Sequence, residues 1–206
     1  MFGKVWEMIV AGGAVMWPII VVSLIIWTLI IEKYFSLKKE IANPDGFTDT
    51  IIAFLKNKKE KSALNFCLNF HDAVLPSAVR LLLLEKEKGK EHLSKLMRQI
   101  FHETYPLLEK NLSTIAVLAK VAPLLGLLGT VTGMVSTFTS ISMYGTSDPQ
   151  ALAKGISQAL ITTQAGLIVA IPALFFHNYM VRKTDDVMNT TEKNLMKIIN
   201  FLKEVR

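Results

Sequence analysis

Hydroxyl and amide side chains stand out within two long stretches, residues 121–144 and 155–181, that contain no Asp, Glu, Lys or Arg. Such groups can orient water or replace part of the hydration shell of a cation, although they cannot hold a charge themselves. If ions move here, a partner must therefore supply the titrating acid. The residues that we predict to line an ion pathway are Thr130, Thr163, Gln158 and Thr162.

Small residues recur in the same stretches at steps of three and four, which places them on one face of a helix. The two predicted strips are Gly126, Thr130, Gly133, Thr137 and Ser140, and Ala159, Thr163, Gly166, Ala170 and Ala173. Such strips let membrane helices approach closely, so they either only pack helices together or also line a space that tolerates polar groups. The residues that we expect to pack the helices or shape a pore are Pro123, Gly126, Gly129, Gly133, Gly166 and Pro172.

The elements that must position these residues are membrane-spanning helices. The 206-residue chain is 51% hydrophobic with a mean hydropathy of +0.38, and a third uncharged run covers residues 8–31. Each run exceeds the roughly 20 residues that cross a bilayer. The first run is longer than the core of a cleavable signal, so we expect it to remain as an anchor. The predicted fold is an all-α membrane protein with three transmembrane helices extended by long cytoplasmic helices.

The distribution of basic residues predicts the orientation. Of the 23 Lys and Arg residues, 14 lie between residues 33 and 110 and six between 182 and 206. The positive-inside rule places both segments in the cytoplasm. The expected order is a periplasmic N-terminus (1–9), transmembrane helix 1 (10–32), a cytoplasmic helical segment (33–117), transmembrane helix 2 (118–142), a periplasmic loop (143–154), transmembrane helix 3 (155–181) and a cytoplasmic tail (182–206).

Several function classes are disfavoured by the sequence. Acidic residues are interspersed among the basic ones, which is typical of a solvated helical surface and not of a nucleic-acid site. The hydroxyls of the spans lack a neighbouring base, so we expect no enzyme and no cofactor. Cys67 is the single cysteine, which argues against a metal site.

Within the cytoplasmic segments, residues 42–47 ("ANPDGF") indicate a turn. From residue 76 to 120 we expect a long amphipathic helix that runs into the second span and is kinked at Pro106. A final amphipathic helix should continue the third span into the tail.

The segments "APLLGLLGTVTGMVSTF" and "GISQALITTQAGLIVAIPALFFHNYMVRK" resemble the signature hairpin of the MotA/TolQ/ExbB proton-channel family, in its ExbB/TolQ branch. The resemblance implies a homo-oligomeric, pentameric ring in the bacterial inner membrane around an ExbD- or TolR-like partner with one span that bears an Asp. It also implies coupling to a TonB- or TolA-like protein. Thr130 and Thr163 fall on the family threonines that face the partner Asp.

One position departs from the family pattern. Gln158 stands where many relatives have a Glu, and a glutamine cannot titrate. The family resemblance favours H⁺ as the transported ion, while hydroxyl and amide oxygens leave Na⁺ open. The machine that is powered also stays open, since nutrient import, envelope function and a flagellar- or gliding-type stator would share the hairpin. A passive membrane scaffold is the alternative from another class.

Overall fold

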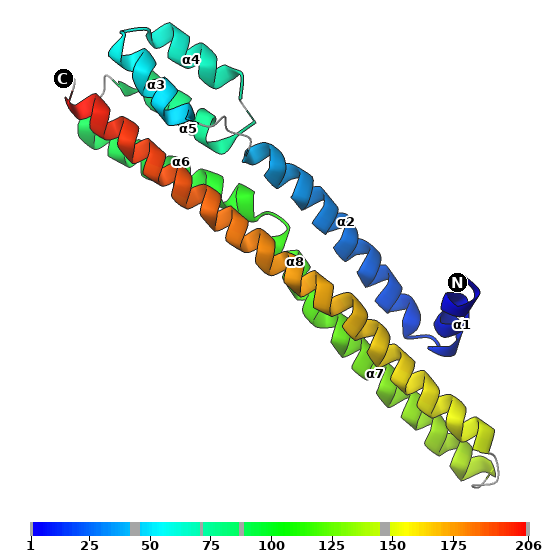
Figure 1. Cartoon of the computed structure of the whole chain (residues 1–206). Helices are drawn as coiled ribbons and strands as arrows, with labels where there is room; N and C mark the ends of the chain where they lie inside the picture. Colours follow the sequence, from blue (N-terminus) through cyan, green and yellow to red (C-terminus); the bar gives the residue numbers. More distant parts are fainter. Residues whose placement is uncertain (1, 42–45, 71, 87–88, 145–148, 205–206) are drawn as a thin grey trace. The chain divides into compact units, whose positions relative to one another are not determined.

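The computed structural model describes residues 2–41, 46–70, 72–86, 89–144 and 149–204, and within these ranges it is helical without strands (Figure 1). The helices are α1 (Phe2–Ala11), α2 (Met16–Glu40), α3 (Phe47–Lys56), α4 (Glu60–Leu68), α5 (Val74–Leu84), α6 (Lys90–Glu109), α7 (Leu112–Tyr144) and α8 (Pro149–Glu204). They form two compact units. The first unit comprises Met1–Glu32 and Asn111–Tyr179, and the second comprises Lys33–Lys110 and Met180–Arg206.

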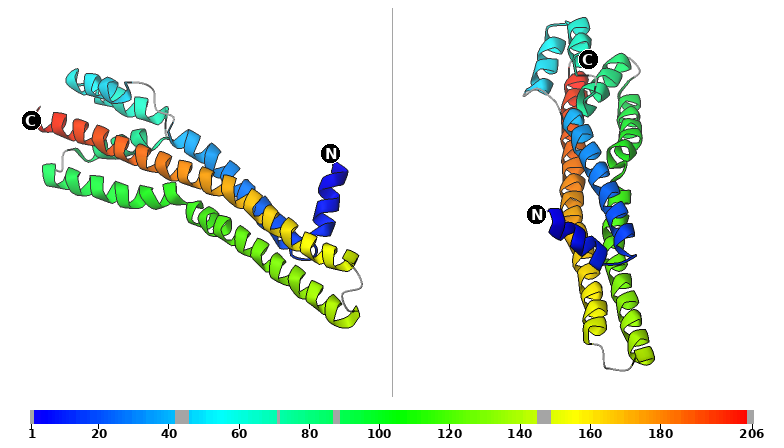
Figure 2. Two further views of the ribbon diagram at one scale, coloured as in Figure 1. Left: turned by 60° about the horizontal axis from the view of Figure 1, so that its bottom comes forward. Right: turned by 90° about the vertical axis from the view of Figure 1, so that its right-hand side faces the viewer.

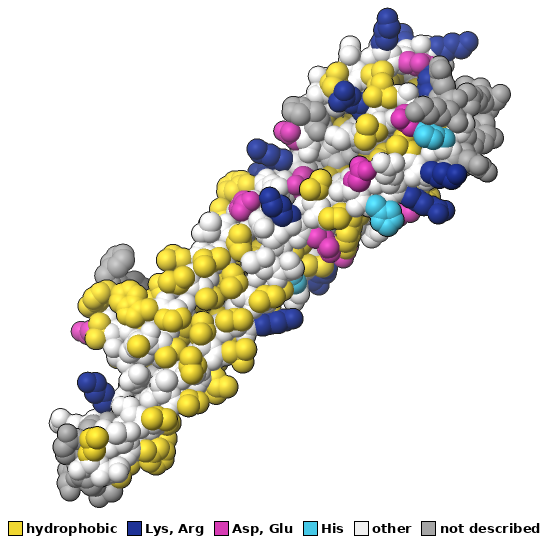
Figure 3. Space-filling view, turned by 180° about the vertical axis from the view of Figure 1, so that it is seen from behind, with side chains coloured by type: hydrophobic (Ala, Val, Ile, Leu, Met, Phe, Trp, Pro, Cys, Tyr) yellow, Lys and Arg dark blue, Asp and Glu magenta, His cyan; other side chains and the backbone are white. Residues whose placement is uncertain are grey.

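The first unit is built on an antiparallel pair of long helices, α7 and the first part of α8, which run side by side in Figures 1 and 2. The first part of α2 joins them through apolar residues on one face, of which Ile19, Ile26 and Ile30 are buried. Among the described residues, three stretches are long and apolar enough to cross a membrane, namely Met16–Glu40, His92–Met143 and Leu152–Leu202. Hydrophobic side chains cover much of the face of this unit that Figure 3 shows, as lipid exposure requires.

The second unit has its own hydrophobic core, to which α3, α4, α5, α6 and the end of α8 contribute. Among the fully buried side chains are Ile51, Val79, Leu82, Leu195 and Ile198. Charged side chains lie on its surface (Figure 3). Burial of the apolar faces stabilises these amphipathic helices, because short isolated helices are marginal in water.

The expected single helix from residue 76 to 120 is wrong, because the structure divides this stretch. α5 ends at Leu84, α6 ends at Glu109, and α7 begins at Leu112. The break before α7 falls at Asn111, which has a φ of 69°, a conformation that Asn tolerates better than most residues. Pro106 lies inside α6, one turn before the break. The predicted continuation of the third span is confirmed, since α8 runs from Pro149 to Glu204.

The first apolar run also contains a break. α1 ends at Ala11, Gly13 adopts a φ of 70°, and α2 begins at Met16. The expected helix from residue 10 to 32 therefore starts later, because a glycine with positive φ ends a helix readily. Residues 42–45 of the predicted turn and residues 145–148 of the predicted loop lie outside the described residues.

Candidate functional site

The centre of the first unit is the contact between α7 and α8, and it is made almost entirely of small side chains. The buried residues of α7 at this contact are Ala122, Gly126, Gly129, Gly133 and Thr137, and those of α8 are Gly155, Ala159, Thr162, Gly166, Ala170 and Ala173. The steps of three and four between them produce one continuous strip on each helix. The two strips face each other, so the small residues serve contact within one chain.

The glycines permit backbone-to-backbone contact. A Cβ atom placed on Gly166 would lie 2.6 Å from the carbonyl oxygen of Ala122, and one on Gly133 would lie 2.8 Å from that of Gly155. A Cβ atom on Gly126 would lie 2.9 Å from the carbonyl oxygen of Thr162. Real Cβ atoms are not accommodated at such distances, so this packing depends on glycine at these positions.

The strips differ from the predicted ones in a systematic way. On α7, Gly129 is buried while Thr130 and Ser140 are only half-buried, and on α8 Thr162 is buried while Thr163 is half-buried. Neighbouring rows at steps of three and four lie close together on a helix. The sequence pattern is therefore compatible with a contact through Thr130 and Thr163 or with one through Gly129 and Thr162. The structure has the second contact, in which a Cβ atom on residue 129 would overlap the side chain of Thr162, so that glycine is needed there.

Thr162 is a packing residue in this arrangement. Its side chain is fully buried, and its hydroxyl donates to the carbonyl oxygens of Ala159 at 2.9 Å and Gln158 at 3.1 Å within its own helix. Thr137 is similar, with a hydroxyl that donates to the carbonyl of Gly133 at 3.0 Å. Both hydroxyls are satisfied by the backbone, as is common for Ser and Thr in helices.

Thr163 and Thr130 lie at the border of the contact. The Thr163 hydroxyl donates across the pair to the carbonyl oxygen of Gly126 at 3.3 Å, and the Thr130 hydroxyl donates to that of Leu127 at 2.6 Å. With 3.6 residues per turn, Thr163 is rotated about 60° from Gly166, and Thr130 about 40° from Gly126 in the same sense. Since the helices are antiparallel, rotation in the same sense brings both threonines to the same edge of the pair, the threonine edge.

Gln158 lies at the opposite edge, rotated about 80° from Gly166 in the other sense. Its side-chain amide lies against Gly13, in the turn between α1 and α2. Phe176 is rotated to the same side and packs edge-to-face against Trp27 of α2, with ring centroids 5.9 Å apart. α2 therefore covers the edge that bears Gln158, and the structure does not bring Gln158 together with Thr130 and Thr163.

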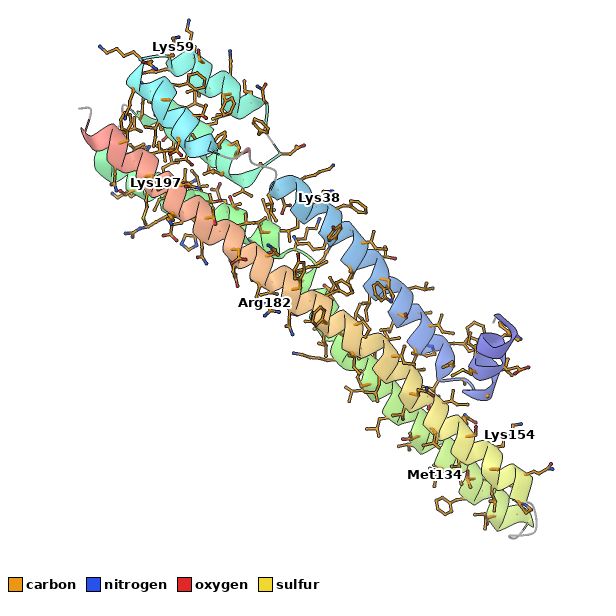
Figure 4. All side chains as sticks on the ribbon, in the orientation of Figure 1. Lys38, Lys59, Met134, Lys154, Arg182 and Lys197 are labelled. Carbon is orange, nitrogen blue, oxygen red and sulfur yellow. The ribbon has the colours of Figure 1, made fainter. Side chains whose placement is uncertain are left out.

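The threonine edge carries exposed apolar side chains. Leu127 of α7 and Leu160 and Leu167 of α8 are exposed, and Met134 projects away from α8 (Figure 4). An open hollow on α8 lies beside Thr163 and is lined by Leu160, Thr163, Gln164, Leu167, Ile168, Ile171 and Pro172. Pro172 lacks an N–H group, so the carbonyl of Ile168 loses its usual helical partner and adds an acceptor near this hollow.

The two prolines predicted to shape the spans lie inside their helices. Pro123 is within α7 and Pro172 within α8, and both helices continue through them. Both side chains are half-buried. Each proline removes one backbone hydrogen bond without ending its helix.

The part of the chain that the structure describes is helical and contains three stretches able to cross a bilayer. Because apolar residues are also exposed around a tightly packed pair of helices, the chain is a multi-pass membrane protein. Residues 68–193 match the family described as the MotA/TolQ/ExbB proton channel family. Because this match covers more than half of the chain, the chain belongs to that family. The family is one of channel components, and α7 and the hairpin part of α8 lie within the matched region.

Several curated relatives are similar over much of the chain. A putative biopolymer transport protein ExbB homolog of Methanothermobacter thermautotrophicus is 29% identical over 93% of this chain and 68% of its own length. The biopolymer transport protein ExbB of Pseudomonas putida is 29% identical over 82% of this chain and only 53% of its own length. The ExbB-like protein 3 of Synechocystis is 31% identical over 82% of this chain and 80% of its own length.

Two features of the site were not predicted from the sequence. One is the contribution of Gly155, which faces the Thr137 side chain and extends the α8 strip by one turn; its spacing of four from Ala159 was the available signal. The other is the contact of Gly13 with Gln158. The adjacent glycines at 12 and 13 are a signal for a helix break that the expected helix over residues 10–32 did not take into account, and no local pattern indicates which residue would contact the turn.

Proposed function

We propose that the chain is an ion-channel and motor subunit of the bacterial inner membrane. In this proposal several copies, five by family resemblance, form a ring around an ExbD- or TolR-like partner whose single span supplies an intramembrane Asp. Ion flow through the complex produces mechanical work for TonB-dependent import or Tol-type envelope function. H⁺ is the proposed ion, with Na⁺ as the alternative.

The observation that carries this proposal is the arrangement of the threonine edge. Thr130 and Thr163 share the edge of the helix pair that α2 leaves open, and the hydroxyl of Thr163 borders a hollow. The uncharged runs contain no carboxylate of their own, so a proton carrier there must come from another chain. A partner carboxylate on this edge would meet two hydroxyls within a largely apolar surface, and each hydroxyl would turn from its backbone carbonyl to form a stronger hydrogen bond to the charge.

A passive scaffold is the second candidate, and one observation favours it. The small strips are occupied by contact between α7 and α8 of the same chain, so they need no pore to account for them. The small strips therefore do not support an ion pathway over a passive scaffold. The two candidate functions differ in the role that they assign to Thr130 and Thr163. A flagellar- or gliding-type stator would use the same threonine edge, and it differs only in the machine that is powered.

The test uses Thr163→Val and Thr130→Val, which keep the side-chain shape and remove the hydroxyl. If the hydroxyls face a charged partner, transport that depends on the complex should fall about tenfold or more, because a hydrogen bond to a charged group contributes about 1.5–3 kcal/mol. The matched control is Thr139→Val, since Thr139 lies on α7, is exposed, and donates only to the carbonyl of Val135.

Assembly must be measured beside transport, because Thr163 also links the two helices. An interhelical hydrogen bond of this kind averages about 0.6 kcal/mol in a membrane protein, so the complex should still assemble. Unchanged transport in both valine variants, with normal assembly, would favour the scaffold. Measurement of transport with H⁺ and Na⁺ gradients varied separately then identifies the ion.

A further inference from the structure

The turn between α1 and α2 contacts α8 through Gly13. Gly13, with a φ of 70°, lies so close to Gln158 that a Cβ atom on it would overlap the side-chain amide nitrogen and lie 3.0 Å from the amide carbon. Both residues belong to the first unit. The contact joins the α1–α2 turn to the first part of α8, which is far away in the sequence.

The turn itself is rich in backbone hydrogen bonds. The N–H of Gly12 donates to the carbonyl of Met8, that of Gly13 to Val10, and that of Met16 to Gly13. Gly13 lies between the end of α1 and the start of α2, so the opposite partial charges of the two helix ends meet there. The atom of Gln158 that lies closest to the place of a Cβ atom on Gly13 is Nε2, and an amide group, unlike a carboxylate, carries N–H donors.

We infer that Gln158 is a positioning residue that fixes the α1–α2 turn, and that it does not line the ion pathway. The N–H groups of Gly12, Gly13 and Met16 already donate within the turn, so a glutamate carboxylate, which can only accept, would find none of these three donors available. The amide therefore fits the glycine turn of this chain in a way that a carboxylate does not. Gln158 also lies at the edge of the helix pair opposite the threonine edge.

Hydrogen exchange of the purified chain in lipid nanodiscs tests this inference, and it does not depend on whether the chain conducts ions. Gln158→Ala should accelerate exchange of the backbone amides of residues 12–17 by about five- to thirty-fold, the range for loss of one or two kcal/mol. Gln158→Glu should accelerate it at least as much. The control is Gln164→Ala, which removes the same group from an exposed position of the same helix.

A second pair of variants keeps the inference testable if Gln158→Ala is poorly folded. Gly13→Ala should loosen the turn through the overlap with Gln158 and through its positive φ. In the double variant Gly13→Ala with Gln158→Ala, the new methyl group enters the vacated space, so the two effects should be less than additive. Additive effects, or unchanged exchange at residues 12–17 in Gln158→Ala, would overturn the inference.

The last readout separates positioning from conduction. In membranes that contain the chain with its partner, Gln158→Ala should leave the preference for H⁺ over Na⁺ as it is in the natural chain. A changed preference would overturn the inference, because it would place the side chain in the pathway. Loss of transport in Thr163→Val bears on the proposed function alone, so the two can fail independently.

Discussion

Thr162 and Thr163 are adjacent in the sequence, yet the helix assigns them different surroundings. Thr162 is fully buried against α7 with its hydroxyl bonded to its own helix, whereas Thr163 is half-buried and donates to the neighbouring helix. The difference of about 100° between consecutive residues decides which hydroxyl remains beside an open surface. In the proposed function Thr130 and Thr163 face the ion pathway, whereas Thr162 packs the helix pair and Gln158 lies at the opposite edge.

The contact between Gly129 and Thr162 gives a prediction about single residues. Gly129→Ala should destabilise the helix pair by about 1–3 kcal/mol, because the added methyl group overlaps Thr162 and overpacks the contact. Combining it with Thr162→Gly moves the space to the other helix and should restore most of the loss. Thermal unfolding in detergent measures both variants. Equal stability of Gly129→Ala and the natural chain would contradict the observed packing.

A second prediction at this scale concerns Cys67 in the core of the second unit. Burial raises the pKa of its thiol from about 9 to about 11, although the charge of Arg80 opposes the shift. Between pH 9 and 11 the Cys67 thiol is thus largely protonated in the folded chain and largely ionised in the unfolded chain. The stability contributed by this group is complete below pH 9 and should decline between pH 9 and 11, by at most about 1.4 kcal/mol per pH unit.

Comparison with Cys67→Ala isolates this effect from other groups that titrate in the same range. The unfolding free energy of the natural chain relative to the variant should be constant from pH 7 to 8 and should fall from pH 9 to 11. A difference that stays flat across the whole range would show that the thiol ionises equally in both states.

Among the elements, the helix breaks are the least predictable part of the fold. The sequence predicts the apolar runs, the amphipathic tail and the basic segments, because each is a pattern over many residues. The breaks at Gly13 and Asn111 depend on one residue with positive φ, and a proline at 106 was the stronger local signal. The sequence pattern also could not predict which of Thr162 and Thr163 is buried, since this depends on the side chains that α7 presents.

The break between α6 and α7 gives a prediction about elements. Asn111 has a φ of 69°, and its side-chain amide donates to Glu32 at 3.4 Å. Asn111→Ala should lower stability by about 1–2 kcal/mol, the cost of a left-handed conformation for an ordinary residue. Asn111→Gly should lose less, because glycine adopts this φ freely. Thermal unfolding measures both, and a more stable alanine variant would indicate a continuous helix here.

For the molecule as a whole, the charge distribution decides how the chain crosses the membrane. The first unit carries few charges outside its helix ends, whereas the second contains the two segments with 14 and six basic residues. The positive-inside rule counts the basic residues within about 20 residues of the spans, and Lys33, Lys38 and Arg182 are among those that lie in the second unit, so this unit should stay on the cytoplasmic side. The short connection from α7 to α8, near Lys154, should then face the periplasm.

Two single-cysteine variants in a Cys67→Ala background test this orientation. Lys154 lies near the start of α8 and Lys197 near its end, and both side chains are exposed (Figure 4). In Lys154→Cys, a membrane-impermeant maleimide should react with intact spheroplasts, because the thiol lies outside. In Lys197→Cys it should react only after the membrane is permeabilised. The reverse pattern would invert the topology and would place the second unit, with most of the basic residues, on the side that the positive-inside rule disfavours.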